Sequence, residues 1–122
     1  MFEVTVTTVI SAAHHLSGYK GKCENNHGHN YKVEATVGSN DQDQTGLTLD
    51  FGILRKLLEQ VAGKFDHSCL NDHPEFEKLN PSSENLARVI YQALKAAAED
   101  YPVKVIRIRV WETEGSFVTY YE

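Results

Sequence analysis

The 122-residue sequence has no apolar run long enough to cross a membrane, and Glu3 and Thr5 interrupt its first apolar stretch. We therefore expect neither a membrane-spanning segment nor a secretory signal. Basic residues are also scarce, with 12 Lys and Arg against 17 Asp and Glu and a net charge of -5. Nucleic-acid-binding domains usually present a basic surface, so no nucleic-acid partner is expected, although a local basic pocket could hold a small anion.

Cysteine is rare as well, with Cys23 and Cys69 as the two that occur. Two cysteines do not make a disulfide framework, and we expect a cytoplasmic protein that keeps both reduced. Cys69 is expected to be a small buried hydrophobic residue. The sequence has no internal repeat, low-complexity segment or linker, and its length predicts one domain over residues 1–122.

The apolar residues that are present follow two periods. Alternation of apolar and polar residues predicts four strands, and recurrence every three to four residues predicts two helices. The predicted strands are residues 2–14, 29–38, 103–113 and 116–122, and the predicted helices are residues 51–64 and 83–100. Asp50 and either Ser82 or Ser83 are suited to cap the helices. The order β-β-α-α-β-β predicts an α+β fold with both helices on one face of a four-stranded antiparallel sheet.

The long predicted strands also bear on oligomeric state. An open sheet leaves two edges with unpaired backbone groups, and such edges must be paired or covered. We therefore expect neighbouring subunits to pair their strands into a closed barrel.

A histidine-rich stretch follows the first predicted strand. His27 and His29 are two residues apart, so both side chains point to one side of an extended chain, and Gly28 permits a close approach. His14 continues the apolar face of the first strand, and His29 begins that of the second. Antiparallel pairing of the two strands would bring His14 and His29 close together. Three histidines with a place left for water or substrate are typical of catalytic zinc.

Cys23 leaves a second interpretation open. As a fourth ligand it would close a structural zinc site of one cysteine and three histidines. As a thiolate it could instead act as a base or nucleophile beside a histidine. Asp66 and His67 could supply that partner, because an aspartate can orient a histidine, but such a dipeptide is more often a loop or capping pair. The spacing alone does not decide between these interpretations.

Glu112 lies on the same face of its predicted strand as Ile106, Ile108 and Val110. A buried carboxylate is costly unless it is paired. A nitrogen heterocycle with two N–H donors would pair it. The alternative is a strand-end glutamate that reaches solvent.

Six short stretches carry these residues in order and cover nearly the whole chain. They are Ser11-Ala-Ala-His14, Cys23-x-x-x-His27-Gly-His29, Leu49-Asp-Phe51, Phe65-Asp-His67-x-x-Leu-Asn71, Pro81-Ser-Ser-Glu-Asn85 and Trp111-Glu-Thr113. Together they resemble the 6-pyruvoyltetrahydropterin synthase family and its bacterial 6-carboxytetrahydropterin synthase branch. The resemblance implies the tunnelling fold, or T-fold, a β-β-α-α-β-β subunit whose trimers close a barrel and stack into homohexamers.

The resemblance also implies a role for each matching residue. The implied zinc ligands are His14, His27 and His29. The implied catalytic residues are Cys23, Asp66, His67 and Glu112, and Glu112 also anchors the pterin ring. The implied lining of the pterin pocket is Ser82, Ser83 and Glu84. His15 stands where the family often has arginine, so Lys20 and Lys22 are the candidates for contacts with phosphate.

The implied activity is the zinc-dependent conversion of 7,8-dihydroneopterin triphosphate to 6-carboxy-5,6,7,8-tetrahydropterin, with release of acetaldehyde and triphosphate, in queuosine biosynthesis. Zinc would act as a Lewis acid, Cys23 would remove a side-chain proton and His67 would relay protons. The spacing from Cys23 to His27 resembles the bacterial branch, whereas Glu24 resembles a subgroup that also forms 6-hydroxymethyl-dihydropterin for folate. Formation of 6-pyruvoyltetrahydropterin is another alternative. The last alternative is a non-catalytic module that binds zinc or pterin, but such a module would not need Cys23, Asp66 and His67 together.

Overall fold

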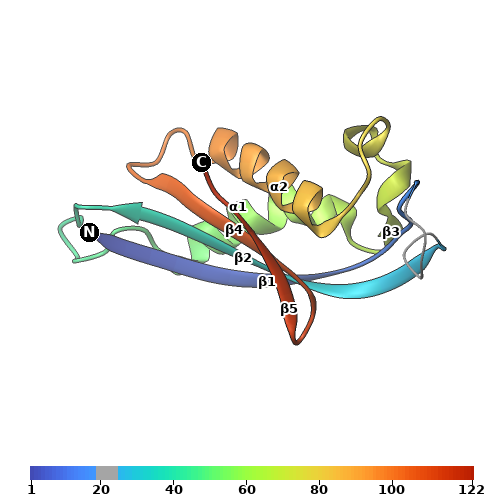
Figure 1. Cartoon of the computed structure of the whole chain (residues 1–122). Coiled ribbons are helices and arrows are strands. Elements are labelled where there is room, and N and C mark those ends of the chain that lie inside the picture. Colours follow the sequence, from blue (N-terminus) through green and yellow to red (C-terminus); the bar gives the residue numbers. More distant parts are fainter. Residues whose placement is uncertain (19–24) are drawn as a thin grey trace.

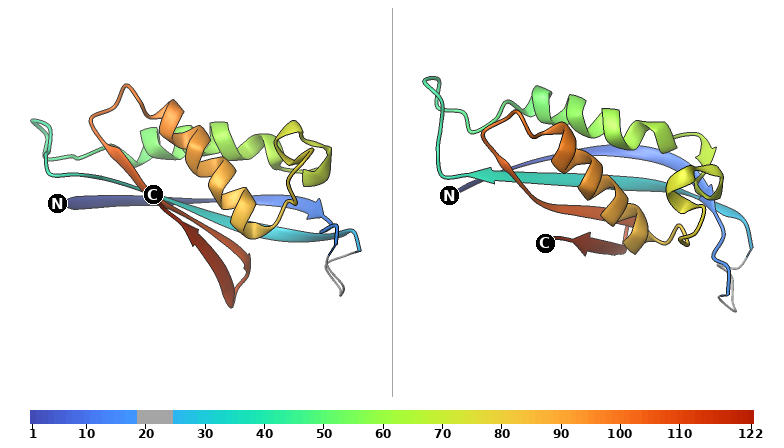
Figure 2. Two further views of the ribbon diagram at one scale, coloured as in Figure 1. Left: turned by 45° about the horizontal axis from the view of Figure 1, so that its top comes forward. Right: turned by 90° about the horizontal axis from the view of Figure 1, so that it is seen from above.

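Two long strands form the frame of the structure, a computed structural model that describes residues 1–18 and 25–122. Strand β1 is Phe2–His14 and strand β2 is His27–Ser39, and β4 (Lys104–Thr113) and β5 (Ser116–Tyr120) extend the sheet. Helices α1 (Phe51–Ala62) and α2 (Ser83–Ala97) both pack on one face of this sheet (Figures 1 and 2). The predicted α+β fold is therefore confirmed. None of the described helices is long and apolar enough to span a membrane.

Within residues 1–18 and 25–122 the sheet has five strands in the order β3-β1-β2-β4-β5, and the shortest strand is parallel to its neighbour. This strand, β3 (Ser68–Cys69), pairs with Ala12 and Ala13 of β1. The prediction of a purely antiparallel, four-stranded sheet is wrong at this edge, because two residues are too few to show alternation. Three short 3-10 turns, Gly63–Phe65, Leu70–Asp72 and Pro74–Phe76, surround β3 between the two helices.

The pairing of β1 with β2 sets the position of the histidines. His14 pairs with His27 and Ala12 pairs with His29, and residues directly opposite each other point to the same side. The same face carries Ile10 and Tyr31, which are fully buried under the helices. The three histidine side chains therefore continue the core face to the far end of the hairpin, as the alternation predicts.

A β-bulge changes the predicted face of β4. Ile108 and Val110 are fully buried as expected, but the register shifts between Thr36 and Val37 of the neighbouring strand. Beyond the shift, Val105 packs against the core in place of Ile106. One extra residue in a strand reverses the sides of the residues that follow it. The predicted apolar face is therefore correct toward Glu112 and wrong at Ile106.

Both helices begin at the predicted caps. The Asp50 carboxylate accepts hydrogen bonds from the backbone N–H groups of Gly52 and Ile53, and the Ser82 hydroxyl accepts one from Asn85. Each cap stabilises its helix by about 1 kcal/mol. The buried leucines and isoleucines of the helices form the core with the inner face of the sheet, and α2 begins beside the histidine end of the hairpin. The cap of α2 therefore lies next to the candidate site.

Candidate active site

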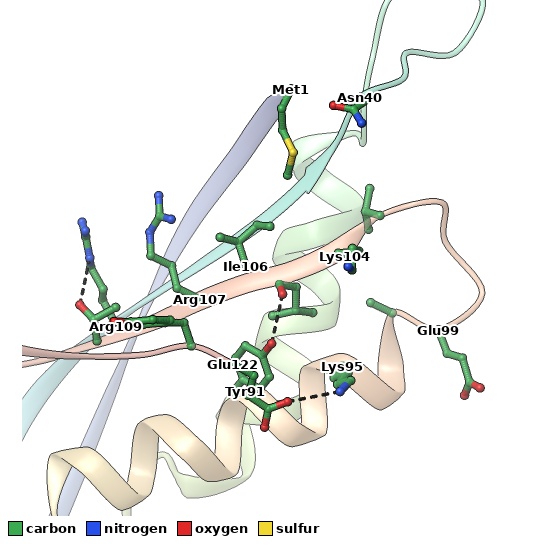
Figure 3. A pocket seen from close by; sticks show the side chains of 15 residues that line it. Met1, Asn40, Tyr91, Lys95, Glu99, Lys104, Ile106, Arg107, Arg109 and Glu122 are labelled. Atoms are coloured by element: carbon green, nitrogen blue, oxygen red, sulfur yellow. Dashed lines mark hydrogen bonds and ion pairs between the residues drawn. The ribbon is translucent and has the colours of Figure 1, made fainter.

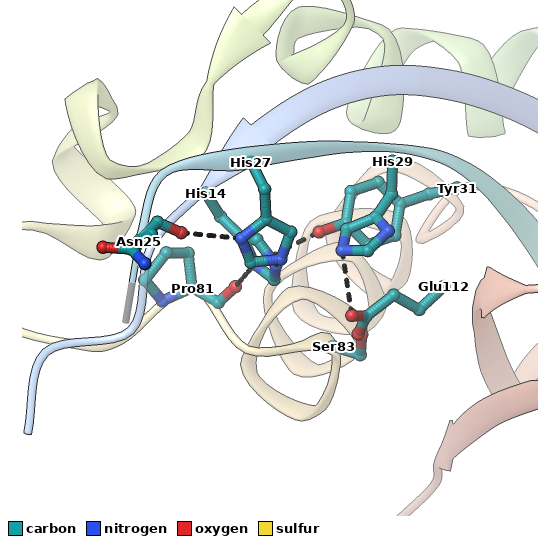
Figure 4. Close-up of polar contacts among 8 residues, drawn as sticks. All are labelled: His14, Asn25, His27, His29, Tyr31, Pro81, Ser83 and Glu112. Carbon is teal, nitrogen blue, oxygen red and sulfur yellow. Dashed lines mark hydrogen bonds and ion pairs between the residues drawn. The ribbon is translucent and has the colours of Figure 1, made fainter. Parts of the chain in front are cut away.

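Three histidine rings meet at the end of the β1–β2 hairpin where β1 leaves toward the loop and β2 begins (Figure 4). The Nε2 atoms of His14 and His27 are 3.1 Å apart, and the ring of His29 lies 5.2 Å from that of His14 and 4.7 Å from that of His27, between centroids. His14 is buried, with 1% of its surface exposed. The predicted convergence of the three histidines is confirmed, and their role as zinc ligands remains a prediction.

Backbone carbonyls orient two of the rings. His14 Nδ1–H donates to the carbonyl oxygen of Pro81 at 2.7 Å, and His27 Nδ1–H donates to that of Asn25 at 2.7 Å. The Tyr31 hydroxyl lies 3.2 Å from the same nitrogen of His14. Because a carbonyl oxygen can only accept, both rings carry hydrogen on Nδ1 and present the Nε2 lone pair. Outer hydrogen bonds of this kind fix the tautomer of metal-binding histidines.

The nitrogen atoms fit a metal cation. Two Nε2 lone pairs at 3.1 Å repel each other unless a proton or a cation stands between them. His29 Nε2 is buried and has no hydrogen-bond partner among the described residues, although Glu112 Oε1 lies 3.0 Å away. The ligand atoms of His14, His27, His29 and Glu112 all lie within 4.8 Å of one another. Such a set of nitrogen and oxygen donors suits zinc.

The charge state of His29 is consistent with metal binding. Burial lowers the pKa of His29 below its ordinary value, and the charge of Glu112 opposes this shift. The neighbouring His14 and His27 lower the pKa of His29 further. The ring is therefore neutral at neutral pH, and neutral imidazole is the form that binds metal ions.

Glu112, at the end of β4, faces the cluster rather than solvent. Its Oε2 accepts a hydrogen bond of 2.6 Å from the hydroxyl of Ser83, a residue with 5% of its surface exposed. Ser82 uses its hydroxyl to cap α2, and Glu84 is exposed in the first turn of that helix. The N-terminal end of α2 thus contacts the cluster twice, through the carbonyl of Pro81, which precedes the helix, and through Ser83, its first residue.

Asp66 and His67 touch each other but lie apart from the cluster. His67 Nδ1 lies 2.9 Å from Asp66 Oδ2, and the other Asp66 oxygen accepts the backbone N–H of Ser11 at 2.7 Å. The Ser11 N–H and then His67 hold the pKa of Asp66 below its ordinary value. The His67 side chain is 83% exposed and lines a concavity with Ser11 and Ala13, whose side chains point away from the helices. Within one chain, the pair and the cluster therefore occupy opposite faces of the sheet.

The remaining predicted residues have different outcomes. Cys23, Glu24, Lys20 and Lys22 lie outside the described residues, so their roles remain predictions. Cys69 is only partly buried and lines the same concavity as His67, which corrects its assignment to the core. It is kept from the interior because it pairs with Ala13, whose side chain points outward.

Two asparagines hold the segment that leaves β1 after His14. The Asn71 amide accepts the backbone N–H of His15 at 3.0 Å and donates to its carbonyl at 3.1 Å. The Asn80 amide does the same for Ser17, at 3.0 and 2.9 Å. Asn71 follows a buried leucine and Asn80 precedes a proline, positions that predict loop residues. Neither position predicts the hydrogen bonds to His15 and Ser17.

A hollow of about 940 Å³ lies at the opposite end of β4 (Figure 3). Its lining includes Lys95 and Glu122, whose charged groups are 3.3 Å apart, and Tyr91, whose hydroxyl donates to the carbonyl of Val105. Of the residues predicted to act in catalysis, those that the structure describes, Asp66, His67 and Glu112, are not among those that line it. The candidate active site is therefore the histidine cluster, where four possible metal ligands converge.

Comparison with known proteins gives a consistent result. Residues 3–122 match the profile of a family described as 6-pyruvoyl tetrahydropterin synthase. A protein of Archaeoglobus fulgidus with the provisional name 6-carboxy-5,6,7,8-tetrahydropterin synthase is 37% identical over 93% of this chain and 90% of its own length. The 6-carboxy-5,6,7,8-tetrahydropterin synthase of Bacillus subtilis is 34% identical over 98% of this chain and 84% of its own. The solved 6-pyruvoyl tetrahydropterin synthase of Caenorhabditis elegans superimposes with a TM-score of 0.85, at 29% identity, over 100% of this chain and 97% of that one.

Proposed function

Because the chain belongs to the 6-pyruvoyl tetrahydropterin synthase family and has its T-fold, we propose that it converts 7,8-dihydroneopterin triphosphate to 6-carboxy-5,6,7,8-tetrahydropterin. It is a 6-carboxytetrahydropterin synthase-like lyase, and relatives with that name match nearly the whole chain. The observation that carries the proposal is the cluster of His14, His27 and His29 beside Glu112. We place the reaction in the cytoplasm, on the route to queuosine.

The histidines would hold zinc through their Nε2 atoms. Bound zinc supplies a Lewis acid that polarises hydroxyl oxygens of the substrate side chain and makes the neighbouring C–H groups more acidic. In the overall reaction the bond to triphosphate breaks, one water is taken up, and a carbon–carbon bond of the side chain breaks to release acetaldehyde. The Pro81 and Asn25 carbonyls keep His14 and His27 in the tautomer that this role requires.

Proton transfer would fall to Cys23 and to the Asp66–His67 pair. Cys23 would remove a side-chain proton as thiolate, and His67 would return or relay protons. His67 is held at a φ of 55°, a conformation that costs about 1 kcal/mol or more in a residue other than glycine. Its ring is largely exposed on the sheet face away from the cluster. We infer that the pair of one subunit serves the cluster of a neighbouring subunit.

The pterin ring would bind beside Glu112. A carboxylate with two oxygens can accept two N–H groups from one edge of a heterocycle. Ser83 already donates to this carboxylate, which supports a positioning role for Ser83. Ser82 and Glu84, at the start of the same helix, remain proposed as the rest of the pocket lining.

The sheet edges support a homotrimer or homohexamer. Strand β5 covers β4 only from Ile108 to Thr113, so the part of β4 from Lys104 to Arg107 has no partner on that side among the described strands. This unpaired edge borders the hollow of Figure 3. A strand from a neighbouring subunit would cover it and would bring active-site groups of two subunits together.

The decisive experiment supplies 7,8-dihydroneopterin triphosphate to the purified zinc-loaded protein and identifies the pterin product by mass spectrometry. We expect 6-carboxy-5,6,7,8-tetrahydropterin as the main product. The solved relative named as a 6-pyruvoyl tetrahydropterin synthase keeps the pyruvoyl product as an alternative. If Glu24 supports 6-hydroxymethyl-dihydropterin formation, that product should disappear in Glu24→Gln. A zinc-loaded oligomer without turnover would instead indicate a non-catalytic module.

A further inference from the structure

The carboxylate of Glu112 lies between the histidine cluster and the place proposed for the pterin ring. Oε1 lies 3.0 Å from His29 Nε2, while Oε2 accepts the Ser83 hydroxyl (Figure 4). The pterin ring of the proposed substrate would need the same two oxygens. One carboxylate therefore faces both the metal cluster and the place proposed for the ring.

The contact between Glu112 and His29 is not a hydrogen bond. Although the two atoms are close, His29 Nε2 has no hydrogen-bond partner in the part of the chain that the structure describes, so Oε1 lies off the direction of a ring N–H. A nitrogen lone pair and a carboxylate oxygen that lie side by side are arranged as neighbouring ligands of one cation. Two ligands on a tetrahedral zinc stand roughly 3.3 Å apart, given bonds of about 2.0–2.1 Å. The His29–Glu112 and His14–His27 separations, 3.0 and 3.1 Å, are both close to that value.

We propose that Glu112 is the fourth ligand of the metal in the substrate-free protein, and that it leaves the metal when a pterin ring binds. The proposal rests on the zinc- and pterin-binding function inferred above. The buried Ser83 hydroxyl holds Oε2 and leaves Oε1 for the metal. The incoming ring takes the carboxylate, so the fourth position opens only when substrate is present. In the substrate-free protein, Glu112 would thereby keep water and other ligands away from the ion.

The first test compares zinc affinities by titration against a competing chelator. Glu112→Gln keeps the shape and an acceptor for Ser83 but removes the charge, and Glu112→Asp keeps the charge but withdraws it by one methylene. Both should bind zinc at least tenfold more weakly than wild type, since even outer-sphere partners contribute about 10- to 100-fold. Glu114→Gln, the same change at an exposed turn residue two positions on, should leave zinc affinity unchanged. Wild-type zinc affinity in folded Glu112→Gln and Glu112→Asp would overturn the proposal.

The second test measures how zinc binding and pterin binding affect each other, with a pterin that lacks the side chain of the substrate as the probe. If the ring withdraws Glu112, saturating pterin should weaken zinc binding to wild type, and zinc should weaken pterin binding by the same factor. An unchanged or higher zinc affinity in the presence of pterin would overturn the exchange. Either negative result leaves the three histidines and the proposed reaction intact. Failure of the proposed function would instead appear as retention of zinc after loss of the histidines, or as absence of turnover.

Discussion

Replacing His14 with alanine tests the two-strand metal site most directly. The ring has a structural role through Nδ1 and a proposed metal-binding role through Nε2, and experiments can separate the two. His14 is 1% exposed and its Nδ1–H satisfies the buried carbonyl of Pro81. A buried acceptor that loses its donor destabilises the fold by about 1–3 kcal/mol. Zinc at a hundred times its Kd stabilises the folded state by about 2.7 kcal/mol. His14→Ala should lose both contributions.

His27→Ala is the matched control. His27 is partly exposed and its Nδ1–H bonds to the carbonyl of Asn25, an exposed residue where water can replace the ring. This variant should lose the stabilisation by zinc. In chelator its free energy of unfolding should differ from that of wild type by about 0.5 kcal/mol or less, as is usual for surface substitutions.

Urea unfolding with EDTA and with excess zinc separates the two contributions. In EDTA only His14→Ala should be clearly less stable than wild type. In excess zinc, wild type should gain stability and the two variants should not. In thermal unfolding, the melting temperature of wild type should rise by roughly 4 °C for each kcal/mol gained. Full zinc content in purified His14→Ala, measured by elemental analysis, would refute the site. Equal stability of the two variants in EDTA would refute the role assigned to the Pro81 contact.

Further predictions concern the groups outside the cluster. Cys23→Ala should keep its zinc, melt near wild type and lose turnover by roughly 10²-fold or more, the scale of a lost general base; loss of zinc would indicate that Cys23 is a ligand. The lowered pKa of Asp66 means that its carboxylate stabilises the fold fully above about pH 4, the unfolded value, and that this contribution is lost as the pH falls through the folded pKa. The difference in unfolding free energy between wild type and Asp66→Asn should therefore shrink below pH 4, and a difference independent of pH would contradict the contact with Ser11. Light scattering should show a trimer or hexamer at working concentration, and a monomer would count against the barrel.

The long strands and the histidine cluster could be predicted because they depend on local periodicity. Thirteen alternating residues in β1 fix which side His14 faces, and the same parity in β2 aligns His27 and His29 with it. Antiparallel pairing then leaves few other arrangements. The position of Glu112 on the core face followed from the same argument, although its contact with His29 depends on β4 lying next to β2.

What could not be predicted depends on contacts between distant segments. Strand β3 has two residues and exists because His67 and its neighbours bond to Ser11 of β1, a contact with no local pattern. The bulge opposite Thr36 shifts Ile106 out of the core side without any glycine or proline in β4 to indicate it. The contact between Asp66 and His67 was left open by the sequence, and their position on the sheet face away from the cluster also depends on distant segments.

The cluster joins parts of the chain that are far apart in sequence, and an ion held there would act as a cross-link. His14 and His27 are separated by 13 positions, and Glu112 belongs to a strand near the other end of the sequence. Closing such loops in advance lowers the entropy that the chain loses when it folds, by an amount that grows slowly with loop length. The effect should be concentrated where the hairpin is held by few other contacts. Removal of the ion should therefore speed amide hydrogen exchange at residues 12–14 and 27–29, while exchange under the two helices stays slow.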